Sequence, residues 1–242
     1  MADLLDRILE AHGGAQRWQG VHSVLARVSI GGLGFASRLQ GNPLKDVEVT
    51  VTTAWPSIAL AEWPRTGQTG YCQPSRIWIE EAHGALVDER SAPGATFRSV
   101  PHWLWWDQLD VLYYCGNVIW QSLCLPFTMN REGCTVRELS PLDIGDEKLQ
   151  RLAVIYPDDI PSVRSDHVFH ADATGLLRRV DFSPLFGGPW VQASQVLSAF
   201  ETVSGFNCAT RHRVYPCMPG GRVLPVGPLG WMDVEDITFA WS

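Results

Sequence analysis

Residues 102–127, HWLWWDQLDVLYYCGNVIWQSLCLPF, constrain the fold more than any other part of the chain. The stretch is too long for one strand, since strands usually run about five or six residues. Its charges are Asp107 and Asp110, and its aromatic side chains recur three and four residues apart, as on a helix face. We therefore expect one helix over residues 103–124, or two helices joined near Gly116, because glycine costs about 1 kcal/mol of helix propensity.

The predicted helix has two faces, and neither carries a charge after Asp110. One face presents Trp103, Trp106, Asp110, Tyr113, Asn117 and Trp120, and the other presents Leu112, Cys115, Ile119 and Leu123. Both faces must therefore be covered by protein or ligand. We expect the aromatic face to line an apolar cavity within a curved sheet. A membrane span is disfavoured, because the apolar run that starts at Val111 is at the short limit for crossing a bilayer and is interrupted by polar amides.

Alternation with a period of two predicts strands on both sides of the aromatic segment. Val47, Val49 and Val51 alternate with polar side chains, as in an antiparallel strand with one buried face. Residues 166–182 predict a hairpin with its tight turn at residues 173–175. Clusters of Gly, Pro, Asn or Ser separate most of the strand-like runs.

The order of these elements predicts the architecture. A short helix at residues 1–14 comes first, followed by about five strands, the aromatic segment at residues 102–127, and six or seven more strands. No repeat or linker divides the chain, so we expect residues 1–242 to form a single domain. It would be mainly β with helices (α+β): a curved antiparallel β half-barrel that encloses a helical plug and an apolar cavity.

The acidic composition disfavours a nucleic-acid partner. The formal net charge is −7 and the isoelectric point is about 5.4, whereas proteins that bind phosphate backbones are usually basic. The N-terminus carries acidic residues and no apolar run of the secretory type, so we expect no signal peptide and a cytoplasmic localisation. The six cysteines include no CxxC pair and are expected to be reduced thiols.

No metal and no cofactor are expected. His167 and His170 lie three residues apart in a predicted strand, where their side chains point to opposite faces. No HExxH, CxxC or GxSxG motif occurs. The GGLG at residues 31–34 lacks the βαβ setting that a dinucleotide site requires.

The candidate catalytic residues are Asp107, Tyr113, His167 and Arg179. In an apolar helix, desolvation would raise the pKa of the Asp107 carboxyl, so that it could deliver a proton. Asp107 could equally be a first-turn residue favoured by the helix dipole. Arg179 shares a strand face with Asp181 and could pair with a carboxylate. Aromatic faces stack on flat rings and bind cationic centres. The candidate ligand-binding residues are Trp103, Trp106, Asp110, Tyr114, Asn117, Trp120, Phe127 and Asp181.

Five blocks of the sequence resemble motifs of a widespread family of uncharacterised bacterial proteins: AHGGAQRW, WWDQLDVLYYCGNVIW, LPF, HADATGLLRRVDF and TRHRVY, in that order. The resemblance spans most of the chain. It implies a half-barrel similar to the lipoprotein-localisation factors (LolA/LolB-like), with an apolar cavity, a fold that also resembles that of the violacein-pathway enzyme VioE and of periplasmic lipid carriers. The chain departs from the pattern at Cys115 and Phe182, so no substrate transfers with the resemblance.

Two functions follow as hypotheses. The first is a cofactor-independent cyclase or isomerase of specialised (secondary) metabolism, which holds a hydrophobic small molecule and acts through orientation and one proton donor or acceptor. The alternative is a non-enzymatic carrier or binding protein for a lipid or other apolar ligand. The expected lack of a signal peptide favours the enzyme. An acid or base in the cavity would favour the enzyme, and a cavity of apolar groups would favour the carrier.

Overall fold

The computed structural model describes residues 3–97, 104–144, 147–158, 160, 164–184, 191–218, 221–224 and 226–241. The strands in these ranges are β1 (Val21–Gly31), β2 (Leu44–Thr52), β3 (Ser57–Ala61), β4 (Gln68–Cys72), β5 (Arg76–Glu81), β6 (Leu86–Ser91), β7 (Thr135–Ile144), β8 (Glu147–Ile155), β9 (Arg164–Ala171), β10 (Leu177–Pro184), β11 (Ala193–Val203), β12 (Phe206–Met218), β13 (Arg222–Val223) and β14 (Gly230–Trp241). The helices are α1 (Leu4–Ala11), α2 (Ala15–Trp18), α3 (Leu33–Ala36), α4 (Pro93–Phe97), α5 (Gln108–Cys124) and the 3-10 turn η2 (Phe127–Asn130).

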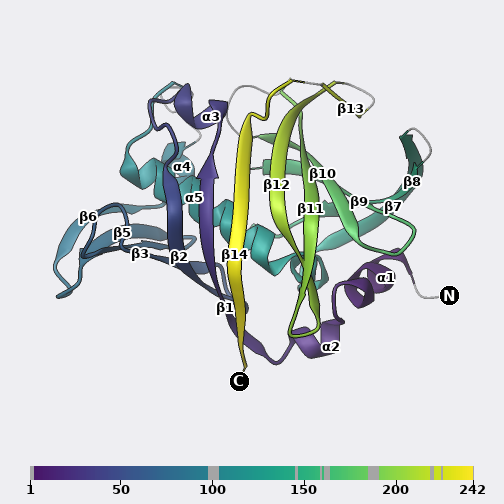
Figure 1. Ribbon diagram of the computed structural model, residues 1–242, viewed down its shortest axis with the longest axis horizontal. Helices are drawn as coiled ribbons and strands as arrows, with labels where there is room; N and C mark the ends of the chain where they lie inside the picture. Colours follow the sequence, from purple (N-terminus) through teal and green to yellow (C-terminus); the bar gives the residue numbers. More distant parts are fainter. Residues whose placement is uncertain are drawn as a thin grey trace.

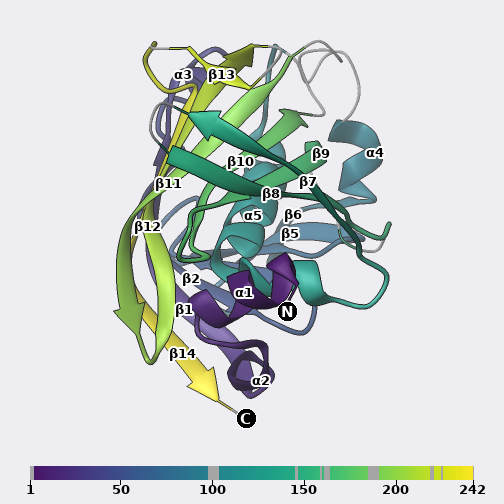
Figure 2. The same cartoon turned by 90° about the vertical axis from the view of Figure 1, so that its right-hand side faces the viewer.

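The described strands form one antiparallel sheet of fourteen strands. Its order is β6-β5-β4-β3-β2-β1-β14-β12-β11-β10-β9-β8-β7, with β13 paired to β12. One meander runs outward from β1 to β6 and the other runs inward from β7 to β12, and pairing of β1 with β14 joins the two. Within the described chain the sheet is open, since β6 and β7 end the order. Figures 1 and 2 show this curved wall with α5 on its concave side, which confirms the predicted half-barrel with a helical plug.

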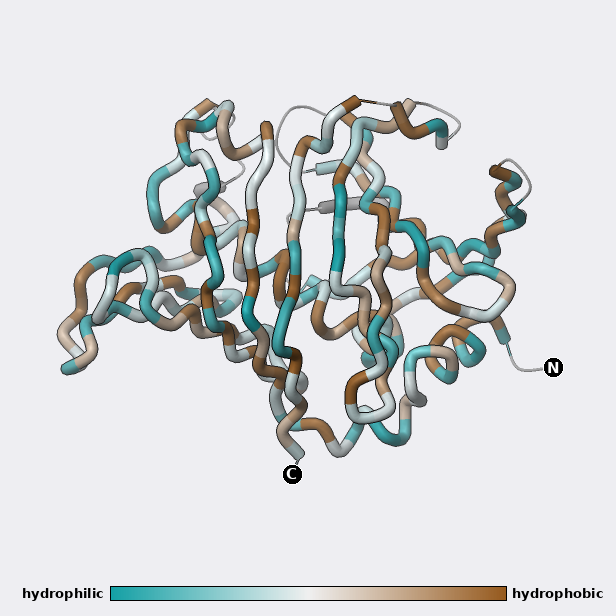
Figure 3. The backbone as a smooth tube through the Cα atoms, viewed as in Figure 1, coloured by the Kyte–Doolittle hydropathy of each residue, from teal (hydrophilic) through white to brown (hydrophobic). Residues whose placement is uncertain are grey.

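The strand patterns agree with their predicted faces. Val47, Val49 and Val51 are buried, whereas Glu48 and Thr50 are exposed. The predicted hairpin is the β9–β10 pair. Figure 3 shows the same alternation of hydrophilic and hydrophobic residues along the central strands.

The N-terminal helix begins and ends at capping residues. The Asp3 carboxylate accepts a hydrogen bond from the Asp6 amide, as an N-cap does. Gly13 and Gly14 follow the helix with positive φ angles of 117° and 89°, which glycine adopts without strain. The helix therefore spans Leu4–Ala11, within the predicted residues 1–14.

Helix α5 is a single helix, and it begins later than predicted. It starts at Gln108 because Asp107 is its N-cap, with extended backbone and a capping box shared with Asp110. Residues 104–107 precede the helix, and Trp103 lies outside the described residues. The helix ends at Cys124, as predicted, and continues without a break through Gly116.

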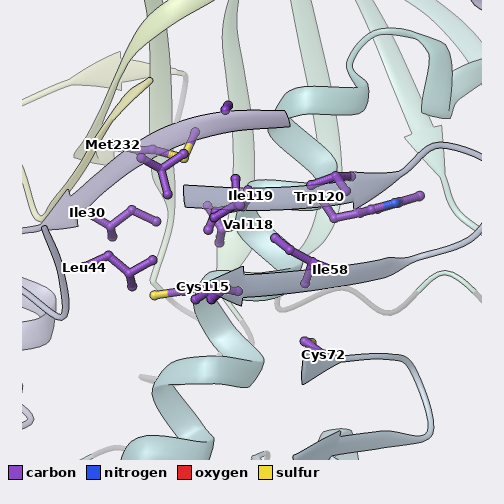
Figure 4. Close-up of a cluster of buried hydrophobic side chains, with 14 of the residues drawn as sticks. Ile30, Leu44, Ile58, Cys72, Cys115, Val118, Ile119, Trp120 and Met232 are labelled. Atoms are coloured by element: carbon purple, nitrogen blue, oxygen red, sulfur yellow. The ribbon is translucent and has the colours of Figure 1, made fainter. Parts of the chain in front are cut away.

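The buried face of α5 packs closely against the sheet. Figure 4 shows Cys115, Val118 and Ile119 of the helix among apolar side chains that include Ile58 and Met232. A Cβ atom on Gly116 would lie 2.8 Å from both Cβ and Sγ of Cys72 on β4. Glycine at this position therefore lets the helix backbone approach the strand.

Replacement of Gly116 by alanine should destabilise the protein. Overpacking against Cys72 costs about 1–3 kcal/mol, which exceeds or offsets the gain of about 1 kcal/mol in helix propensity. Urea denaturation should show a lower free energy of unfolding for Gly116→Ala. Gln108→Ala, at an exposed position of the same helix, serves as control and should change stability by less than about 0.5 kcal/mol. A more stable Gly116→Ala protein would contradict the close approach.

Candidate functional site

An apolar cavity of about 360 Å³ lies at the α3 end of the half-barrel, between α3, the start of α5 and strands β10, β11, β12 and β14. We call it the α3 cavity. Its wall includes the side chains of Leu33, Phe35, Trp106, Tyr114, Phe182 and Val214. In Figure 2, α3 lies at the opposite end of the molecule from α1 and α2.

Glycines at the end of β1 bring α3 over this end of the sheet. Gly32 has a φ of 129°, and a Cβ atom there would lie 2.6 Å from the carbonyl oxygen of Leu229. The Gly34 amide donates a hydrogen bond of 2.7 Å to the same oxygen. A larger residue at position 32 would thus push α3 away from the segment before β14.

Three aromatic rings form one side of the α3 cavity. The Phe35 centroid lies 5.7 Å from that of Trp106 and 5.5 Å from that of Tyr114, both in edge-to-face geometry. The Trp106 and Tyr114 centroids are 5.0 Å apart. The side chain of Gln40 also donates a hydrogen bond to the carbonyl oxygen of Trp106. These contacts fix the segment before α5 against α3.

Arg38 adds a cation to the wall of the α3 cavity. It is 8% exposed, and its Nη1 donates hydrogen bonds to the Gly34 carbonyl (2.7 Å) and the Ser37 hydroxyl (3.2 Å). Its guanidinium carbon lies 4.9 Å from the centroid of the Trp106 ring, within cation–π range. Burial lowers the pKa of Arg38, and the nearby Tyr114 partly counters this.

Other cavities lie elsewhere in the half-barrel. A cavity of about 310 Å³ at the α2 end is lined by Trp18, Phe127 and Arg131, among others. A third, of about 30 Å³, lies beside His12 and His212 and is too small for an organic ligand. Of these three cavities of the described residues, the one at the α3 end has the largest volume and the most apolar wall.

The structure brings only part of the predicted ligand site together. Trp106 and Tyr114 line the α3 cavity, whereas Phe127 lines the cavity at the α2 end. Tyr113, Asn117 and Trp120 are buried and do not line the α3 cavity. Of the predicted aromatic face, Trp106 lines the α3 cavity and lies before the start of α5 at Gln108. The roles of the predicted site residues stay a prediction.

The other residues of the predicted aromatic face form hydrogen bonds within α5 or with the sheet. The side-chain amide of Asn117 donates a hydrogen bond to the backbone carbonyl of Tyr113, one turn earlier in the helix. The Trp120 indole N–H donates to the carbonyl of Thr52 at 2.8 Å. The Tyr113 hydroxyl lies beside Gly94 of α4, 2.9 Å from where a Cβ atom would stand. These side chains fix α5 within the fold.

Asp107 and Asp110 form an ion-pair network with Arg90 of β6. Arg90 Nη1 lies 2.6 Å from the Asp110 carboxylate, and Nη2 pairs with Asp107. Burial raises the pKa of Asp107, but hydrogen bonds from the Asp110 amide and from Arg90 outweigh burial and hold that pKa below its ordinary value. The predicted raised pKa of Asp107 is therefore wrong, because the helix start supplies donors to its charged form.

Loss of the Asp110 charge should cost more stability than loss of the Asp107 charge. The Asp110 side chain is 1% exposed and that of Asp107 is 34% exposed. Breaking a buried pair costs about 3–5 kcal/mol, whereas a partly exposed pair contributes about 1 kcal/mol or less. Urea denaturation of Asp110→Asn and Asp107→Asn, which keep the side-chain size, should show this order. Equal losses would contradict it.

Arg179 and Asp181 belong to a second polar cluster, as their shared strand face predicts. Arg179 forms a bidentate pair with Asp181 at 2.6 and 2.9 Å and donates to the Gly221 carbonyl at 2.6 Å. His170 Nε2 and the Ser194 hydroxyl also contact the Asp181 carboxylate, at 2.9 and 2.5 Å. None of these side chains lines the α3 cavity. The cluster holds the β10–β11 region to the segment that follows β12.

Asp181 should make the protein sensitive to acid. Burial raises its pKa, but hydrogen bonds from His170, Arg179 and Ser194 lower it below the ordinary value of 3.8. A carboxyl whose pKa is lower in the folded state stabilises the fold fully above 3.8, and this stability is lost as the pH falls through the folded-state pKa.

We expect Asp181→Asn to lose about 3 kcal/mol of unfolding free energy at pH 7. Its deficit relative to the wild type should shrink near pH 3, because below 3.8 the unfolded-state carboxyl gains a proton before the folded-state carboxyl does. Denaturant titrations of both proteins at the two pH values measure this. A deficit that does not change with pH would contradict the assignment.

His167, the other catalytic candidate, is buried and packs against aromatic rings. Its ring lies 5.1 Å from that of Tyr156 in edge-to-face geometry and 6.1 Å from that of Phe169. His170 instead contacts Asp181 on the other face of β9, which agrees with the predicted opposite orientations. Among the residues that the structure describes, no group of three His, Cys, Asp or Glu side chains could hold a metal ion.

Among the residues that line the α3 cavity, the sequence patterns predicted only Trp106 and Tyr114 as site residues. Leu33, Phe35 and Arg38 come from the segment after β1, whose GGLG run was considered only as a dinucleotide motif and set aside. Phe182, one of the two departures from the family pattern, lines the α3 cavity, whereas Cys115, the other, is buried in the core. The described cysteines are free thiols, and no described helix has the length and apolarity to cross a membrane.

The fold is that of the LolA-like half-barrels, which confirms the predicted fold. No family model matches the sequence, and no curated protein matches it. A LolA superfamily protein from Nitrosomonas europaea is similar in structure with a TM-score of 0.56 and 12% identity, over 99% of this chain and 94% of that one.

Two further solved structures show the same fold. A putative outer membrane lipoprotein-sorting protein domain from Vibrio parahaemolyticus gives a TM-score of 0.55 at 11% identity, over 98% of this chain and 90% of that one. A DUF1329 family protein from Desulfovibrio piger gives 0.53 at 11% identity, over 98% and 91%. At these identities the likeness shows the fold alone, and the resemblance to VioE stays a prediction.

Proposed function

We propose that the protein is a non-enzymatic binding or carrier protein for an apolar small molecule, which it holds in the α3 cavity. The observation that carries this proposal is the cavity itself, about 360 Å³ with a wall of aromatic and aliphatic side chains. Small-molecule sites usually have about 300–1,000 Å³ and are lined mainly by such side chains, with few polar groups.

The fold supports the same function. The Vibrio parahaemolyticus structure is described as a lipoprotein-sorting domain, and the Nitrosomonas europaea protein belongs to the LolA superfamily. Binding of apolar chains inside a half-barrel is compatible with both descriptions. Fold likeness is an analogy, and the cavity of this chain carries the proposal.

The positions of the catalytic candidates favour a carrier over a cyclase or isomerase. Asp107, Tyr113, His167 and Arg179 do not line the α3 cavity. Asp107 and Arg179 are engaged in ion pairs that stabilise the fold. A carrier needs shape and apolar contact, which the α3 cavity offers, and no proton donor. The cytoplasmic localisation stays a prediction from the sequence.

A cavity-filling variant tests the proposal. Purified protein should bind the neutral fluorescent probe N-phenyl-1-naphthylamine. Val214→Trp should weaken binding by at least about tenfold, because the indole occupies apolar space that the probe would otherwise bury. Val87→Trp, on the exposed strand β6, is the matched control and should bind like the wild type.

Thermal unfolding should confirm that both variants fold. Absence of probe binding by the wild type would overturn the proposed function. Equal binding by wild type and Val214→Trp would show that the probe binds outside the α3 cavity.

A further inference from the structure

Arg38 is the charged side chain among the described residues that line the α3 cavity. We propose that the ligand is an amphiphile with a carboxylate head group, which Arg38 binds, and an apolar chain of about a dozen carbons. This inference rests on the proposed function and names the ligand class. It follows from the position of the guanidinium, the chemistry of the wall and the size of the cavity.

The Arg38 side chain has a defined position. Its Nη1 is anchored to the Gly34 carbonyl and the Ser37 hydroxyl of the α3 segment. The guanidinium also lies over the Trp106 ring, at 4.9 Å from its centroid. A ligand would therefore meet a cation that is already oriented, which reduces the ordering cost of binding.

A carboxylate matches this cation in charge. The Arg38 side chain is 8% exposed, so a carboxylate that binds it would lie in a site with little water, where a charge-assisted hydrogen bond is stronger. Arginine donates charge-assisted hydrogen bonds to carboxylates, and these are stronger than hydrogen bonds between neutral groups. The lowered pKa of Arg38, which burial causes, agrees with this low exposure to water.

The rest of the wall requires an apolar chain. Phe35, Phe182 and Val214 offer no charge to a polar ligand, which disfavours a compact anion such as inorganic phosphate. One water molecule takes roughly 30 Å³ in the liquid, and a methylene group is similar in size. The cavity of about 360 Å³ therefore corresponds to about a dozen such groups. Leu33 lines the cavity and is 62% exposed, so the cavity opens to solvent beside α3.

Competition by three ligands of equal chain length tests the inference. Dodecanoate, dodecan-1-ol and dodecylammonium should displace N-phenyl-1-naphthylamine from the wild type at pH 8, below their aggregation concentrations. We expect dodecanoate to bind at least about tenfold more tightly than the alcohol, and the cation most weakly, because charge-assisted hydrogen bonds are the stronger ones.

Arg38→Gln should remove this preference. Its affinity for dodecanoate should fall about ten- to a hundredfold, whereas that for dodecan-1-ol should stay within about twofold, since the apolar wall is unchanged. Arg38→Lys should lose several-fold in affinity for dodecanoate, because it keeps the charge but loses the guanidinium that Gly34 and Ser37 anchor. Arg27→Gln removes an exposed arginine that pairs with Asp46 outside the cavity, and it should keep the wild-type preference.

The outcomes separate this inference from the proposed function. The carboxylate proposal would be overturned if the wild type bound dodecan-1-ol and dodecanoate equally, or if Arg38→Gln kept the preference for dodecanoate. Either result would leave the proposed binding of an apolar ligand intact. Failure of the wild type to bind the probe or any of the three ligands would overturn both. If Arg38→Gln does not fold, Arg38→Lys decides, and a wild-type preference in that variant would overturn the role of the Arg38 guanidinium.

Discussion

Burial of α5 is the constraint on which the rest of the structure depends. After Asp110 the helix carries no charged side chain, so apolar cover is needed on nearly every side. A flat sheet would cover one side only, whereas a sheet that curves around the helix covers several. The β1–β14 pairing makes this possible, because it joins two meanders into one continuous wall. Gly116 then lets the helix approach β4 closely.

The polar groups of the barrel interior mainly stabilise the fold. Asp107 and Asp110 cap α5 and bind Arg90, and thereby tie the helix start to the edge strand β6. Arg179 and Asp181 connect β10 to the segment after β12. Carboxylates held by several donors keep their charge and are poor proton donors at neutral pH. The same contacts that secure these elements therefore argue against a catalytic role for them.

Arg38 differs from these residues in its surroundings. It lies at the wall of a cavity with an aromatic face, and α3 holds its position. The glycines after β1 allow α3 to cross the end of the barrel, so the same turn creates the cavity and places the cation within it. The shape of the backbone at one turn thus links the fold to the proposed ligand chemistry.

The sequence by itself determined the local elements and the class of fold. The alternation at Val47–Val51 marks a strand with one buried face, and the uncharged run after Asp110 marks a buried helix, because each period reports which side of an element meets water. The resemblance in short motifs extended this to the half-barrel.

Only the tertiary structure decided the site. Arg38 and Trp106 are far apart in the sequence but in contact in the structure. Neither the hydrophobic periodicity of a segment nor the spacing of its residues predicts such a contact. The pKa of Asp107 was predicted in the wrong direction because hydrogen bonds from the Asp110 amide and from Arg90, which β6 brings to the helix start, outweigh burial. Local patterns record burial, whereas the partner of a buried group depends on strand register and helix packing. These are determined only when the whole sheet curves around α5.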